Sequence, residues 1–173
     1  MDPDIKEHTL VALVQDKPGV LNRIASMFRR RGFNISSLAV GHSEADGFSR
    51  MTFVVQSDSA VVDQVIKQLY KLIDVVKVSD ISEESVVARE LALVKVSTTS
   101  ETRLEVLQLV EIFRSNVVDV SEDSVIIEVT GDMNKVDSLL RILSPFGIAE
   151  VMRTGRIGLM RGLSNSLALD SIQ

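Results

Sequence analysis

The spacing of apolar residues constrains the fold of this chain most strongly, because it switches repeatedly between the period of a strand and the period of a helix. Alternating apolar residues predict strands at His8–Val14, Asn34–His42, Phe48–Gln56 and Val75–Ile81. Helical spacing follows the first of these strands over Val20–Phe28 and the third from Asp58 to Ile73. This β-α-β-β-α-β order predicts two helices on one face of a four-stranded antiparallel sheet, the ferredoxin-like arrangement.

The same pattern starts again after a polar segment, Ser82–Ser85, which we interpret as a linker. The later strands are predicted at Glu90–Ser97, Val117–Ser121, Val125–Thr130 and Ile148–Thr154, and the later helices at Thr102–Arg114 and Asn134–Leu143. The chain is therefore expected to contain the arrangement twice.

Local similarity connects the two halves. Arg23–Phe28 resembles Gln108–Phe113, and Val61–Val65 resembles Lys135–Leu139. We predict an α+β protein with two ferredoxin-like modules in tandem, covering residues 1–82 and 83–173, the second ending in a short tail.

The composition argues against several classes of function. Cysteine is absent, so disulfides, thiol catalysis and thiolate metal ligation are not available. A formal net charge of -5 argues against a nucleic-acid-binding face, which requires clustered lysine and arginine. The apolar runs are too short to cross a bilayer, and the start lacks a basic, apolar export signal. These features predict a soluble, cytoplasmic protein with no nucleic-acid or membrane partner.

The segment Asp16–Leu21, where the first predicted strand gives way to a helix, is the most distinctive local feature. Gly19 has no Cβ, so a ligand could approach its backbone closely. The amides of Gly19, Val20 and Leu21 are expected to be unpaired donors at the positive end of a helix. Asp16 adds an acceptor for an ammonium group, so the segment suits both charged ends of a free α-amino acid. A capping Asp16 followed by a simple turn explains the same residues without a ligand.

Asn34 begins the second predicted strand, and its amide group can donate and accept hydrogen bonds at once. It could therefore recognise either end of an amino acid. Asparagine is also common in the turn after a helix, so Asn34 supports a ligand site only in combination with Asp16.

The remaining polar residues predict neither a catalytic residue nor a metal ligand. His8 and His42 match no metal or triad spacing, and we interpret them as solvated or packed imidazoles. Arg29–Arg31 points in several directions around a helix end, where cations complement the helix dipole.

In combination, these residues resemble the small regulatory subunits of acetolactate synthase (acetohydroxyacid synthase), whose N-terminal module is an ACT domain. In the first module the resemblance rests on Asp16–Leu21, Arg31–Leu38, Ser49–Thr52 and Lys67–Val75. In the second module it rests on Arg89–Val96, Glu111–Arg114, Arg153–Ile157 and Arg161–Gly162. The resemblance thus covers nearly the whole chain.

The resemblance implies a subunit without a catalytic site of its own. Such subunits bind and activate a large subunit that condenses two pyruvates to acetolactate and CO2 in branched-chain amino-acid biosynthesis, and they confer feedback inhibition by valine. Thiamine diphosphate, magnesium and FAD are then expected on the large subunit, with no cofactor bound by this chain.

The resemblance also implies a homodimer in which two ACT domains pair side by side and the effector lies between them. Carried over by motif position, the valine site takes one wall from each chain: Asp16, Gly19, Val20 and Leu21 from one, and Asn34 and Ile35 from its partner. Several relatives have asparagine in place of Asp16, so this carboxylate is a mild departure.

Other functions share parts of the pattern. A free-standing ACT-domain sensor that regulates another enzyme is the main alternative. A transcriptional regulator would need a DNA-reading helix-turn-helix, for which the chain has no spare residues. An RNA-recognition module has the same element order but stacks bases on sheet aromatics, and aromatic residues form only 4% of this chain. The fold alone does not exclude an enzyme with its own active site.

Overall fold

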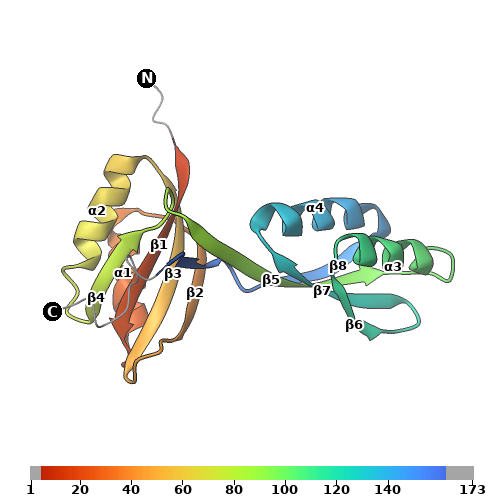
Figure 1. Cartoon of the computed structure of the whole chain (residues 1–173), viewed down its shortest axis with the longest axis horizontal. Coiled ribbons are helices and arrows are strands. Elements are labelled where there is room, and N and C mark those ends of the chain that lie inside the picture. The colour runs from red at the N-terminus through yellow and green to blue at the C-terminus, as the bar shows by residue number, and fades with distance from the viewer. Residues whose placement is uncertain (1–4, 163–173) are drawn as a thin grey trace. The chain divides into compact units, whose positions relative to one another are not determined.

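The computed structural model describes residues 5–162, which form two compact units (Figure 1). The first unit contains residues 5–87 together with 156–162, and the second contains residues 88–155. The division therefore lies slightly later than the expected boundary between residues 82 and 83, and residues 156–162 belong with the first unit instead of the second. The predicted tail, Ser164–Gln173, lies outside the described residues.

The first unit is a four-stranded antiparallel sheet with two helices against one face (Figure 1). Its elements, in chain order, are β1 (Lys6–Gln15), α1 (Val20–Arg31), β2 (Ile35–His42), β3 (Phe48–Ser57), α2 (Ser59–Leu69) and β4 (Val75–Asp80). The strands lie in the order β2-β3-β1-β4. The predicted β-α-β-β-α-β module is confirmed.

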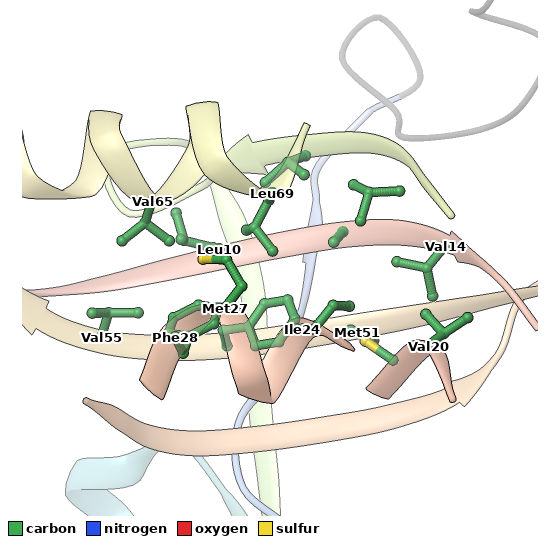
Figure 2. Close-up of a cluster of buried hydrophobic side chains, with 14 of the residues drawn as sticks. Leu10, Val14, Val20, Ile24, Met27, Phe28, Met51, Val55, Val65 and Leu69 are labelled. Carbon is green, nitrogen blue, oxygen red and sulfur yellow. The ribbon is translucent and has the colours of Figure 1, made fainter. Parts of the chain in front are cut away.

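The core of this unit lies between the sheet and the two helices. Leu10 of β1 is in register with Phe53 of β3, so both side chains point to the helix face. Phe28 of α1 stacks on Phe53 with ring centroids 5.6 Å apart. Figure 2 shows how Val65 and Leu69 of α2 complete the same cluster. Burial of these side chains holds both helices on the sheet.

The opposite face of the sheet is partly covered by a short strand that the apolar spacing did not predict, β9 (Ile157–Met160). Val11 lies on this face because its neighbours in β1 point to the helices. It clusters with Ile81, Val86 and Met160. Gly158 permits the close approach, since a Cβ at this position would lie 2.9 Å from Ile81 Cδ1.

Arg156 attaches β9 to the sheet through polar contacts. Its Nη1 donates to Thr9 Oγ1 over 2.9 Å, and its Nη2 donates to Glu7 Oε2 over 2.9 Å. Its backbone amide donates to Ser37 Oγ over 3.1 Å. One residue of the Arg153–Ile157 motif therefore contacts both β1 and β2.

The second unit repeats the arrangement of the first. Its elements are β5 (Val86–Ser97), α3 (Arg103–Ile112), β6 (Asn116–Val120), β7 (Ser124–Gly131), α4 (Met133–Leu143), a 3-10 turn η1 (Ser144–Phe146) and β8 (Ile148–Arg153). The strand order β6-β7-β5-β8 corresponds strand for strand to that of the first sheet, and β9 pairs with β5. None of the described helices is long and apolar enough to span a membrane. The predicted tandem of related modules is confirmed.

We expect Arg156→Ala to lower the free energy of unfolding by about 1–3 kcal/mol, because it removes charge-assisted hydrogen bonds at partly buried positions. Urea denaturation followed by circular dichroism measures this change. Arg89→Ala is the control, because among the described residues the guanidinium of Arg89 contacts only the carbonyl of Ala88. Equal losses in the two variants would contradict a specific role for Arg156.

Candidate functional site

The loop between β1 and α1 is the candidate site, and its backbone depends on glycine. Gly19 is the N-cap of α1 and has φ 87°, in the left-handed region. A Cβ there would meet only Arg23 Nη1, at 3.9 Å, so the space beside Gly19 is open. Glycine is therefore favoured here by the backbone conformation and leaves room for a ligand.

The amides of this loop differ in their availability. Val20 donates its amide to the carbonyl of Lys17 over 3.3 Å, and its side chain is buried in the core. The expectation that the Val20 amide is an unpaired donor is therefore wrong, because a tight turn uses it. Among the described residues, the amides of Gly19 and Leu21 have no hydrogen-bond partner. These two donors lie at the positive end of α1 and can face an anion.

Asp16 does not cap the helix, since no side chain bonds to the first turn of α1. Its Oδ2 instead lies 3.1 Å from Nδ1 of His42, which ends β2 and has a largely exposed side chain. The backbone amide of Asp16 donates to the carbonyl of Gly47 over 2.8 Å. The turn is thereby fixed to the β2–β3 hairpin while the carboxylate stays accessible.

Arg23 is a further candidate site residue, which the sequence patterns did not single out. Its Nε lies 2.8 Å from Oδ2 of the buried Asp74 side chain. The carbonyl of Asp74 also accepts from the amide of Gln15 over 2.8 Å, at the end of β1. The guanidinium is thus held beside Gly19, one turn later on the same helix, which is the spacing that could have revealed it. It adds a positive charge next to the free amides.

The hairpin that supports this loop carries its own ion pair. Arg50 Nη2 donates to both carboxylate oxygens of Glu44 over 2.8 Å. These hydrogen bonds are the main cause that lowers the pKa of the Glu44 carboxyl below its usual value. The β2–β3 hairpin, whose Gly47 carbonyl accepts from the Asp16 amide, is therefore stabilised by the Arg50–Glu44 ion pair.

The corresponding loop of the second module satisfies its own donors. The amide of Thr99 donates to Thr102 Oγ1 over 2.9 Å, and the amide of Thr102 donates to Thr99 Oγ1 over 3.2 Å. Two threonine hydroxyls therefore accept from the backbone amides of the turn that precedes α3. The corresponding turn of the first module contains Pro18 and Gly19 in place of these threonines.

Asn34 and Ile35 lie away from this loop within one chain. Asn34 is exposed and Ile35 is partly buried, just after the C-terminal end of α1. A helix of this length spans about 18 Å, and the Gly19 loop is at its other end. A single chain therefore does not bring Asp16 and Asn34 together.

The histidines take no part in a metal or triad arrangement among residues 5–162. His8 is buried and its Nδ1 lies 2.9 Å from Asp80 Oδ2, while its Nε2 has no partner. The hydroxyl of Ser82 bonds to the other oxygen of Asp80 and accepts from the amide of Thr9, away from the imidazole. No group of His, Cys, Asp and Glu in this part of the chain has the geometry of a metal site.

We expect Gly19→Ala to lower the free energy of unfolding by about 1–2 kcal/mol, because a Cβ is unfavourable at this backbone angle. Gly41→Ala is the matched control, since Gly41 has no positive φ and a Cβ added there would meet nothing within 4 Å. Thermal unfolding of both variants provides the measurement. A stable Gly19→Ala protein would show that the loop can adopt another conformation.

Known proteins resemble this chain over both units. Residues 10–77 match the family described as "AHAS small subunit-like ACT domain", and residues 89–162 match "Small subunit of acetolactate synthase". The "Probable acetolactate synthase small subunit" of Archaeoglobus fulgidus is 54% identical over 156 residues, covering 90% of this chain and 98% of that protein. The "Acetolactate synthase small subunit" of Mycobacterium bovis is 50% identical over 157 residues, covering 91% and 94%.

A solved structure agrees with these matches. The acetolactate synthase small subunit from Thermotoga maritima superposes with a TM-score of 0.85 at 44% sequence identity. The match covers 92% of this chain and 99% of that one. The chain belongs to the family of acetolactate synthase small subunits, with an ACT domain as its first module.

Proposed function

We propose that this chain is a regulatory subunit that binds and activates the large catalytic subunit of acetolactate synthase and makes it sensitive to valine. The observation that carries this proposal is the open loop at the start of α1, where Gly19 and Leu21 leave two amides unpaired beside Arg23. The equivalent turn of the second module has no glycine and bonds its own amides to the hydroxyls of Thr99 and Thr102. The proposal therefore places the site in the first module.

Valine has two charged ends and an apolar side chain, and the loop offers a partner for each. Its carboxylate would accept from the amides of Gly19 and Leu21 at the positive helix end, close to the Arg23 guanidinium. Its ammonium would donate to Asp16. The half-exposed Leu21 side chain supplies apolar surface for the isopropyl group. Asp16 and Arg23 thus recognise opposite charges of one ligand.

The second wall of the site is proposed to come from another copy of the chain. Asn34 and Ile35 lie at the far end of α1, so they can reach a valine at the loop only as residues of a partner. β2 is at the edge of its sheet and presents Val40 half exposed, which suits side-by-side pairing of two ACT domains. Valine would then bind between the two chains of the homodimer, so its binding would be coupled to the way in which the two chains pair.

The chemistry belongs to the large subunit in this proposal. Thiamine diphosphate, magnesium and FAD are bound there, in the cytoplasm, where two pyruvates condense to acetolactate and CO2. This chain contributes control in branched-chain amino-acid biosynthesis and no reacting group.

Isothermal titration of the purified chain tests the ligand site. We expect Asp16→Ala to weaken valine binding by about tenfold or more, because a charge-assisted contact to the ammonium is lost. Lys17→Ala is the control, since its exposed side chain forms no hydrogen bond or ion pair with the described residues. An unchanged affinity in Asp16→Ala would rule out this carboxylate as the ammonium acceptor.

Reconstitution with the large subunit tests the regulation. Adding the wild-type chain should raise the rate of acetolactate formation, and valine should reverse the increase. Asp16→Ala should still activate but should respond poorly to valine, because the variant retains the fold and loses the ligand contact. Failure of the wild-type chain to activate would favour the alternative, a free-standing ACT-domain sensor that regulates another enzyme.

A further inference from the structure

A second possible ligand site lies between the C-terminal ends of α1 and α2. It is a groove of about 370 Å³ lined by Met27, Arg30, Arg31, Gln68, Lys71 and Leu72. This volume lies within the range of roughly 300–1,000 Å³ that is typical of small-molecule sites. Within one chain the groove is at the opposite end of α1 from the Gly19 loop, about 18 Å along the helix, so no residue lines both the groove and the loop.

The cations that line this groove are not neutralised by the residues around it. Among the described residues, the side chains of Arg30 and Lys71 form no hydrogen bond or ion pair. Arg31 donates only to Gln68 Oε1, a neutral acceptor, over 3.2 Å. The lining contains no carboxylate. The groove is thus a local positive site on a protein whose net charge is -5.

Helix dipoles explain only part of this charge. Each helix C-terminus contributes about -0.5 elementary charge, so the ends of α1 and α2 together offset roughly one of the three cations. About two positive charges remain without a counterpart in the groove. An anion carrying two negative charges would balance them.

The shape of the lining favours a phosphate group. Two arginine side chains offer planar forks of donors, which match phosphate oxygens with paired hydrogen bonds. Buried Met27 and partly buried Leu72 form the apolar base of the groove, beside the three exposed cations. From these features we infer that the groove binds a compact dianion of the phosphate class, as a second effector site of the ACT domain.

Calorimetric titration of the full chain at low ionic strength, with inorganic phosphate and with pyrophosphate as probes, tests this inference. We expect saturable binding of one anion per chain. The double variant Arg30→Gln with Lys71→Gln should weaken it by about tenfold or more, because charge-assisted contacts are lost. Binding should persist in Asp16→Ala, which separates this site from the proposed valine site.

A matched double variant, Arg29→Gln with Lys67→Gln, removes the same charge from α1 and α2 without touching the groove lining. It should retain affinity within about twofold, since Arg29 and Lys67 are not part of the groove lining and act on the anion only through screened charge. Equal weakening in both double variants would overturn the inference and indicate general charge attraction. Binding of an oligoglutamate peptide without binding of either phosphate probe would also overturn it, and would assign the groove to an acidic protein segment.

Discussion

Strand β1 is buried on both of its faces, and the rest of the first unit is arranged around it. Leu10, Ala12 and Val14 contact the helix layer, while Val11 packs with Ile81, Val86 and Met160 of β9 on the other side. A central strand of this kind must be covered twice, because its apolar side chains point alternately to both faces. Burial on both faces fixes β1 in the middle of the sheet. Its last residue, Gln15, donates its amide to the carbonyl of Asp74, and the candidate loop begins immediately after it.

The two modules differ in the turn that leads into their first helix. At the start of α3, Thr99 and Thr102 supply their own hydroxyl groups to the backbone amides. At the start of α1, Gly19 adopts a left-handed backbone and supplies no side chain. Unpaired amides at a helix start have a free-energy cost unless water or a ligand bonds to them. The ACT module therefore leaves hydrogen bonds unmade at the place where a ligand can make them.

Local patterns predicted most of the fold, because strand and helix periods extend over whole elements. They did not predict β9, whose attachment depends on Arg156 contacts with residues more than a hundred positions earlier in the chain. The candidate site likewise has features that residue type predicts and features that depend on distant contacts. The backbone role of Gly19 followed from residue type, whereas the positions of Arg23 and His42 depend on distant partners, Asp74 and Asp16. The turn that uses the Val20 amide was likewise invisible in the residue types alone.

Helix α1 connects the two ends at which ligands are proposed to bind. Its inner face, formed by Val20, Ile24, Met27 and Phe28, is buried against the sheet. A helix packed in this way moves as a unit, because close-packed side chains resist separate displacement. Met27 belongs both to this core and to the groove at the C-terminal end. If an anion in the groove shifted α1, the shift would reach Gly19 and Leu21 through this packing, and any such coupling would act equally in both directions.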